Sequence, residues 1–348
     1  MIEFFVDVTG TYILCRRWKK MVLKTCCLAL IILLTVSAVV MPGCIEPERA
    51  TVKVGIVFEA CGLEDAFNNL CFAGAQRAED ELGISSDYAI APTAAEFEAV
   101  QRRYAESGEY ALIICTGANQ ADAVMNVSAD FPNQQFALID RALADRANVA
   151  SVVFRDDESS FLAGALAALV TETDKIGFVG GMDIPAIKRF LAGYQAGARY
   201  IDPDCEIMIS YAGSWSDPDK GKELALAQYG AGADIVFAAA GSSGDGVLDA
   251  AEERGYYAIG VDTDQRYLAP DTVLVSVLKR TDVVIFARIK ETVNGDFTGG
   301  IRSFGLKEDA VGISLDNALP VVSDDMKERI SELSGKIISG ELVVPATI

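Results

Sequence analysis

Five short clusters along the chain combine glycines, aromatic rings and charged side chains that could grip a small molecule. They occupy residues 62–69, 180–194, 238–247, 260–265 and 276–280. Asp262 could accept hydrogen bonds from two neighbouring hydroxyl groups, and Lys279 could donate to the same ligand and balance the buried charge. Aromatic rings can stack on a flat ligand, although Phe67 and Phe190 by helical spacing alone would more often be core residues. These residue types suit recognition of a small molecule by hydrogen bonding and stacking.

Catalytic and metal-binding chemistry has little support in the sequence, because the 348 residues include no histidine. Most zinc sites and nearly all serine–histidine hydrolases depend on imidazole as a ligand or a base. Glu59, Glu64 and Asp65 are the acidic residues near the first predicted strand, and their spacing is not that of a metal-ligand set. We expect no metal, no cofactor and no catalytic residue.

The formal charge is −20, and it becomes more negative when the N-terminal segment is set aside. Residues 1–43 carry five basic and two acidic residues, which leaves 25 basic and 48 acidic residues, or −23, on the rest of the chain. Such a surface repels the phosphates of nucleic acids. We therefore expect no nucleic-acid partner.

Strand and helix patterns alternate from residue 52 to residue 339. Apolar runs predict strands at 52–58, 111–117, 135–140, 149–154, 175–181, 206–212, 235–241, 257–262, 273–279 and 310–314. Helical spacing and start signals predict helices at 67–82, 119–130, 158–171, 186–200, 217–230, 246–254, 282–294 and 324–339. This alternation is typical of an α/β protein whose parallel sheets carry helices on both faces.

Ligands on such sheets bind beyond the carboxyl ends of the strands. The predicted ends carry turn glycines and polar groups suited to a pocket rim, and they are Phe58, Gly117, Asp140, Gly181, Gly241, Asp262 and Lys279. The pattern starts again at residue 175 without a long linker or a sequence repeat, so we expect two lobes joined by shared hinge strands. The predicted N-terminal lobe comprises 52–152 and 280–305, and the predicted C-terminal lobe comprises 153–279 and 306–348.

The N-terminus has the order of a secretory signal. Lys24 and two further lysines precede an uncharged run over 26–41, which is shorter than the roughly 20 residues of a spanning helix. The run leads through Met-Pro-Gly to Cys44, an order similar to a lipobox, in which the cysteine is lipidated and becomes the mature N-terminus. An uncleaved helical anchor is the alternative, and Met21 is an alternative start. The predicted segments are a signal over 1–44 and a polar tether over 45–51.

The eight cysteines fall into three groups. Cys15, Cys26 and Cys27 precede the predicted cleavage, and Cys44 would be lipidated. The folded part keeps Cys61, Cys71, Cys115 and Cys205, none of which has metal-site spacing. Cys61 and Cys71 could form a disulfide in an oxidising compartment, but buried free thiols are the favoured interpretation.

Taken in order, the five clusters resemble the basic membrane lipoprotein family. These proteins are ABC-importer substrate-binding proteins of the purine-nucleoside-receptor type, with a two-lobed type I periplasmic-binding fold. Residues 154–169 and 217–222 also resemble the family, and the resemblance covers roughly 52–340. No single motif is decisive, but five in register are specific.

The resemblance implies roles for individual residues of the first cluster. The family motif reads Asp-x-Ser-Phe-Asn, and its Asp, Phe and Asn face the nucleoside. Phe67 and Asn68 match it, whereas Ala66 replaces the serine. The acidic position falls on Asp65 or on Glu64, because the loop has lost or shifted one residue.

The other clusters match the family at single positions. Phe190 matches the aromatic that stacks on the base, Asp262 the carboxylate that accepts the ribose hydroxyls, and Lys279 the ammonium that reaches the sugar. Gly241 would let the backbone approach the ligand, and Trp215 either lines the cleft or packs on its own lobe. The predicted ligand-binding set is Asp65, Phe67, Asn68, Phe190, Gly241, Asp262 and Lys279.

The sequence thus predicts a lipid-anchored protein on the extracytoplasmic face of the cell membrane. It would capture a nucleoside, in the first place a purine nucleoside, and deliver it to an ABC permease and its ATPase. Three alternatives stay open: a sensor that presents its ligand to a signalling receptor, a binding protein for another sugar-like solute, and a nucleoside-cleaving enzyme. A metal-spaced acidic cluster on the first strand would favour the enzyme.

Overall fold

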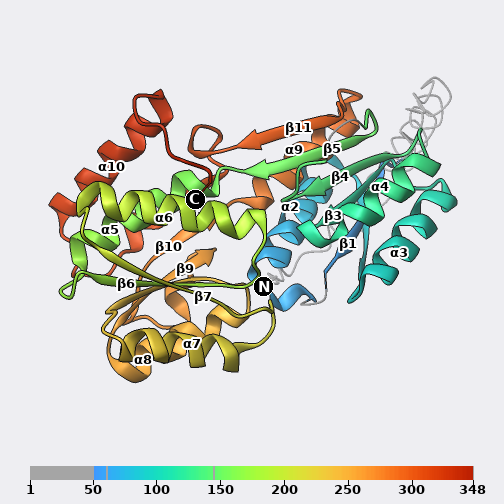
Figure 1. Ribbon diagram of the computed structural model, residues 1–348. Helices are drawn as coiled ribbons and strands as arrows, with labels where there is room; N and C mark the ends of the chain where they lie inside the picture. The colour runs from blue at the N-terminus through green and yellow to red at the C-terminus, as the bar shows by residue number, and fades with distance from the viewer. Residues whose placement is uncertain (1–50, 60–61, 144–145, 348) are drawn as a thin grey trace, which may run out of the picture. The chain divides into compact units, whose positions relative to one another are not determined.

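A computed structural model describes residues 51–59, 62–143 and 146–347 (Figure 1). The predictions for the signal segment, for lipidation of Cys44 and for a Cys61–Cys71 disulfide therefore involve residues outside the described part. Among the described helices, none is both long enough and apolar enough to cross a membrane.

The first sheet has the strand order β11-β5-β4-β3-β1-β2, and every neighbouring pair is parallel. Its strands are β1 (Lys53–Phe58), β2 (Ser85–Ile90), β3 (Leu112–Thr116), β4 (Gln135–Ile139), β5 (Val149–Phe154) and β11 (Gly300–Phe304). Its helices are α2 (Ala66–Leu82) and α9 (Thr281–Asn294) on one face, and α3 (Ala94–Ser107) and α4 (Ala121–Asp130) on the other (Figure 1). We call this sheet with its helices the first lobe.

The second sheet has the order β12-β10-β9-β8-β6-β7. Its strands are β6 (Lys175–Gly180), β7 (Glu206–Tyr211), β8 (Ile235–Ala239), β9 (Tyr257–Asp262), β10 (Val273–Lys279) and β12 (Val311–Ile313). Its helices are α5 (Asp156–Val170), α6 (Pro185–Ile201) and α10 (Asp324–Ser339) on one face, and α7 (Pro218–Gly230) and α8 (Ser243–Arg254) on the other. We call this sheet with its helices the second lobe.

Short 3₁₀ turns complete the described elements: η1 (Gly62–Glu64), η2 (Ala118–Gln120), η3 (Gln265–Tyr267), η4 (Leu306–Glu308) and η5 (Leu315–Asn317). Four buried apolar clusters fill the space between sheets and helices, one on each face of each sheet. The strands at the centre of each sheet are buried along their length, as in β3 and β8, which explains why they read as continuous apolar runs.

The two sheets repeat one topology that the sequence does not reveal as a repeat. In each sheet the second strand lies outside the first, the third to fifth follow on the other side, and a late strand closes the far edge. The chain passes between the lobes after β5, after β10 and after β11. The predicted α/β fold of sheets flanked by helices is confirmed.

Three elements escaped the sequence analysis: β2, α3 and β11. Strands β2 and β11 lie at the two edges of the first sheet, where neither strand has a run of buried residues. Edge strands need no continuous apolar run, so this signal is missing. One pair departs from the predominantly parallel pairing, because β12 runs antiparallel to β10.

Candidate ligand-binding cleft

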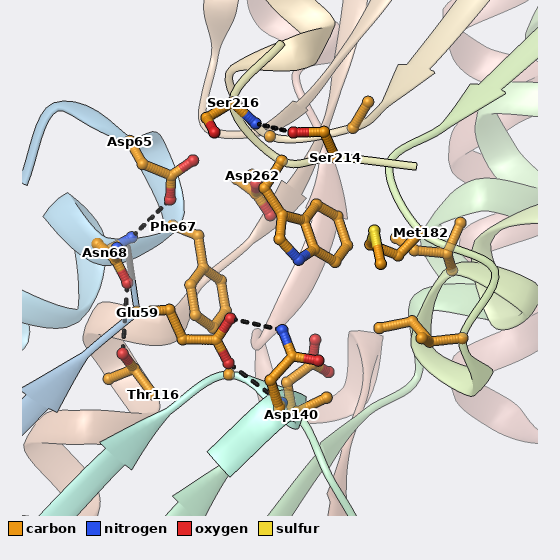
Figure 2. Close-up of a pocket in the computed structure, with 18 of the residues that line it drawn as sticks. Glu59, Asp65, Phe67, Asn68, Thr116, Asp140, Met182, Ser214, Ser216 and Asp262 are labelled. Atoms are coloured by element: carbon orange, nitrogen blue, oxygen red, sulfur yellow. Dashed lines mark hydrogen bonds between the residues drawn. The ribbon is translucent and has the colours of Figure 1, made fainter. Parts of the chain in front are cut away.

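A cavity of about 580 Å³ lies between the two lobes, within the size range of small-molecule sites. It is lined by the loops that follow strands of both sheets, where parallel sheets place their ligands (Figure 2). All seven residues of the predicted ligand-binding set line it: Asp65, Phe67, Asn68, Phe190, Gly241, Asp262 and Lys279. Trp215, for which the sequence left two positions open, lines it as well.

Asp262 ends β9 and turns its carboxylate into the cavity. Its backbone adopts φ 66°, a left-handed conformation that aspartate tolerates better than most residues. The residue is 8% exposed, and no described protein group donates a hydrogen bond to its carboxylate. Burial raises the pKa of Asp262 to about 7, although nearby Lys279 acts in the opposite direction. A buried acceptor without a protein donor is ready for a donor from a ligand.

Lys279 ends β10, and its ammonium is held by two other carboxylates. Its Nζ lies 2.8 Å from an oxygen of Asp140 and 3.3 Å from an oxygen of Asp156. The expected ion pair between Lys279 and Asp262 was therefore wrong: although β9 neighbours β10, the ammonium is paired with Asp140 of the other lobe and with Asp156 at the start of α5. Asp262 still raises the pKa of Lys279, after the larger effects of burial, Asp140 and Asp156.

Two aromatic rings from different lobes approach the same ammonium. Lys279 Nζ lies 5.6 Å from the ring centre of Phe67 on α2 and 5.2 Å from that of Phe190 on α6. Phe190 is only 2% exposed and meets Phe237 edge-on within the second lobe, whereas Phe67 is half-buried. Both rings line the cavity, so the structure brings together the two residues predicted to stack.

The loop before α2 places its two acidic residues differently. Asp65 is buried in the cavity wall, whereas Glu64 is exposed and lies outside the main cavity. Asp65 also caps α2, because its Oδ1 accepts from the backbone N–H of Asn68 at 3.1 Å. Asn68 in turn donates to the carbonyl oxygen of Gly62 at 2.9 Å and accepts from Thr116 at 3.3 Å. The hydrogen bonds of Asp65 and Asn68 thus fix the conformation of the shortened loop.

Glu59, directly after β1, is a cavity residue that the sequence analysis passed over as a ligand contact. Its two carboxylate oxygens accept from the backbone N–H of Asn119 at 3.1 Å and from the Asn119 side chain at 2.8 Å. Gly117 leaves room for it, since a Cβ there would fall 2.2 Å from Glu59 Oε1. Burial raises the pKa of Glu59 to about 7, and the charges of Asp140 and Asp65 add to the rise.

The second lobe closes the cavity with a glycine and an indole. Gly241 has φ 55°, and a Cβ at this position would lie 3.3 Å from Asp65 Oδ2 of the first lobe. The two lobes therefore approach each other closely at this glycine, where a side chain would be in tight contact with Asp65. Trp215 packs on Gly181, where a Cβ would fall 2.4 Å from the indole ring.

The charge of the cavity wall is strongly unbalanced. Glu59, Asp65, Asp140 and Asp262 line it, against Lys279 as its single cation among the described residues. Lys279 is already engaged by Asp140, so the wall offers a ligand mainly hydrogen-bond acceptors. Within the described ranges no three His, Cys, Asp or Glu side chains are arranged to hold a metal ion. The arrangement suits a flat solute that is rich in hydrogen-bond donors, and it disfavours an anion.

Comparison with known proteins shows the family of this chain. Residues 51–347 match the model of the PnrA-like ABC transporter substrate-binding proteins. The chain belongs to this family. The match spans both lobes and all five motif clusters, so it includes the complete cleft.

Individual PnrA-like relatives cover nearly the whole chain. The ABC transporter nucleoside-binding protein BmpA of Lactococcus lactis is 34% identical over 359 residues, which cover 94% of this chain and 99% of BmpA. A lipoprotein of Pyrococcus abyssi is 33% identical over 306 residues, covering 82% of this chain and 76% of that protein. A crystal structure of an ABC transporter solute-binding protein from Aeropyrum pernix superposes with a TM-score of 0.77 at 33% identity, covering 84% of this chain and 94% of that one. The predicted periplasmic-binding fold is confirmed.

The cysteines of this PnrA-like protein contribute no described group to the cleft. Cys71, Cys115 and Cys205 are buried, and no disulfide joins them. Burial raises the pKa of the thiol in each of the three. The buried-thiol interpretation holds for Cys115 and Cys205, while the alternative pairing of Cys71 depends on Cys61, outside the described residues.

Proposed function

We propose that the protein captures a nucleoside, in the first place a purine nucleoside, between its two lobes and delivers it to the permease and ATPase of an ABC importer. The observation that carries the proposal is Asp262, a buried carboxylate that no described protein group satisfies. A ribose diol supplies two donors to one carboxylate, and bonds to a charged acceptor are about twice as strong as neutral ones.

The two phenylalanines supply the second half of a nucleoside site. Phe67 and Phe190 come from different lobes and face one ammonium, so a base entering from the cavity would meet a ring on each side. Stacking of this kind contributes about 1–3 kcal/mol per base in single-strand binders and tolerates different bases. Glu59, fixed by Asn119, offers an acceptor to amino or imino groups on the edge of the base.

The charge of the wall separates nucleosides from nucleotides. A phosphate would enter a cavity with four carboxylates and one engaged ammonium. It would meet repulsion at low dielectric, where charges interact more strongly than in water. We therefore propose that unphosphorylated nucleosides bind and that their 5′-phosphates do not.

Delivery requires that the protein stays near its transporter. We propose that lipidated Cys44 tethers it to the extracytoplasmic face of the cell membrane. The order of basic, apolar and small residues before this cysteine supports the tether. The name of the Pyrococcus abyssi relative, a lipoprotein, is consistent with it.

Thermal-shift measurements on the full chain in detergent test the proposal. The panel consists of adenosine, guanosine, uridine, adenine, ribose and adenosine monophosphate. A ligand at 100 times its Kd stabilises the folded state by about 2.7 kcal/mol, which is readily seen as a rise in Tm. Adenosine or guanosine should give the largest rise, adenine and ribose smaller ones, and adenosine monophosphate none.

Two controls make the result decisive. Asp262→Ala should remove the nucleoside shift, whereas Asp87→Asn, which breaks a surface ion pair with Lys53, should keep it. Mass spectrometry of the bound ligand should recover intact nucleoside, which separates binding from cleavage. If ribose alone gives the whole shift, the solute is a sugar; if no nucleoside shifts the Tm, the proposal fails.

A further inference from the structure

Four charged side chains of alternating sign form a closed ring beneath the cavity. Lys279 Nζ lies 2.8 Å from Asp140 and 3.3 Å from Asp156, and Arg189 lies 3.5 Å from Asp140 and 3.6 Å from Asp156. Lys279 and Asp156 are almost completely buried, and Arg189 and Asp140 are 15% and 13% exposed at their side chains. Each cation therefore contacts both carboxylates.

The ring joins the two lobes at a single residue. Asp140 follows β4 of the first lobe, where its backbone adopts φ 70°, and Figure 2 shows it at the cavity on the first-lobe side. Its three partners belong to the second lobe: Asp156 begins α5, Arg189 lies within α6 and Lys279 ends β10. Both ion pairs of Asp140 therefore cross from one lobe to the other.

Among the described residues, the charged groups of the ring have few other polar contacts. Both oxygens of Asp156, one oxygen of Asp140 and two nitrogens of Arg189 are buried without a hydrogen bond. Their charges are compensated only by the ion pairs of the ring. If the lobes separated at Asp140, two cations would face the single carboxylate of Asp156. Separation is therefore opposed by electrostatics, whichever solute the cleft takes.

We propose that Asp140 is a positioning residue that clasps the two lobes through Lys279 and Arg189 before any ligand binds. The clasp also holds the ammonium of Lys279 within 5.6 Å of the ring centre of Phe67 and 5.2 Å of that of Phe190. A flat ligand entering this slot displaces the ammonium toward its own acceptor groups. The ligand-free cleft is thus largely closed, and ligand entry exchanges one partner of Lys279 for another.

Asp140→Asn tests the clasp in the ligand-free protein. Asparagine tolerates the left-handed backbone at this position and keeps the shape of the side chain, so the change removes mainly the charge. The full chain is studied in detergent with Trp18→Phe, which leaves Trp215 in the cleft as the only tryptophan. Acrylamide quenching of Trp215 reports cleft opening, and hydrogen exchange of the loop around it gives a second reading.

The closed-to-open ratio should fall by about tenfold or more in Asp140→Asn, seen as stronger quenching and faster exchange. Asp87→Asn is the matched control, because it removes an equally short pair, Lys53–Asp87 at 2.8 Å, within the first lobe alone. It should leave the quenching of Trp215 unchanged. In a Lys279→Met background the effect of Asp140→Asn should become smaller, since only the Asp140–Arg189 pair is then left to lose.

Three results would overturn the clasp. They are unchanged quenching in Asp140→Asn, equal increases in Asp140→Asn and Asp87→Asn, or a full effect of Asp140→Asn in the Lys279→Met background. If Asp140→Asn does not fold, Arg189→Gln gives the same test through the other interlobe pair. Because all measurements are made without ligand, they can fail while the nucleoside proposal stands, and the reverse.

Discussion

Replacing Asp262 should weaken ligand binding and stabilise the empty protein at the same time. The carboxylate is buried, lacks a described hydrogen-bond donor and has a pKa raised from 3.8 to about 7. In the empty cleft it therefore lowers stability, and in the filled cleft it would accept the sugar hydroxyls. Few positions in a protein combine these two effects, since most substitutions of buried residues destabilise.

The loss of affinity follows from the bonds that disappear. Hydrogen bonds to charged groups contribute about 1.5–3 kcal/mol each, and a diol would make two. Part of this gain is spent on removing the proton that Asp262 carries near pH 7. A net loss of about 3 kcal/mol corresponds to roughly 100-fold weaker binding in Asp262→Ala. Asp262→Asn keeps one acceptor oxygen without its charge, so we expect an intermediate loss.

The gain in stability depends on pH, and its sign follows from the raised pKa of Asp262. Between pH 4 and pH 7 the folded protein keeps the proton that the unfolded chain has lost, so stability falls as pH rises through this window. The shift corresponds to a penalty on the order of 4 kcal/mol above pH 7. Asp262→Asn has no proton to lose, so its Tm should exceed that of the parent at pH 8 and match it near pH 4.

Calorimetry with adenosine, 2′-deoxyadenosine and adenine tests the predicted loss of affinity. Melting curves at pH 4 and pH 8 test the predicted gain in stability. The parent should discriminate strongly against the 2′-deoxy compound, and Asp262→Ala should lose this discrimination. Binding of adenine should change little in the variants, because a free base has no diol. Equal binding of the ribo and deoxy compounds by the parent would refute the sugar assignment. An unchanged Tm of Asp262→Asn at pH 8 would refute the electrostatic reasoning.

Three further predictions concern the cleft and the tether. Hydrogen-bond donors of a nucleoside favour the ionised form of the carboxylates, and the pKa values of Glu59 and Asp262 are both about 7. The affinity for nucleosides should therefore fall by about tenfold per pH unit for each group as the pH drops from 7 to 5. A Kd that stays constant from pH 5 to pH 8 would contradict this. Phe67→Leu and Phe190→Leu should each weaken nucleosides by roughly 10- to 100-fold, with ribose binding unaffected, as titration calorimetry can show. Cys44→Ser should release the protein from membranes or leave it unprocessed; unchanged size and membrane retention in fractionation would indicate an uncleaved anchor instead.

The sequence predicted the alternation of elements and, with the family resemblance, seven residues that line the cleft. Apolar runs marked the strands because the strands at the centre of each sheet are buried on both faces, and Asp262 and Lys279 stood out as the ends of two such strands. The family resemblance supplied their ligand roles and that of Asn68. It also added the two phenylalanines, whose helical spacing by itself would have placed them in the core. The Asp-Pro start of α7 was read correctly because that signal is local, with Asp217 capping the helix through the N–H of Lys220.

The partners of these residues were decided only by the tertiary structure. The sequence could not show that Lys279 pairs with Asp140, because 139 residues separate them and only the docking of two sheets brings them together. The sequence analysis also passed over Glu59 as a ligand contact. Its carboxylate is held in the cavity wall by hydrogen bonds from Asn119, which lies on a neighbouring loop and is 60 residues away in the sequence. Local patterns report which face of an element is buried, but they do not report which element lies opposite. The electrostatics of the cleft depend on those opposite elements, and therefore on how the two lobes dock.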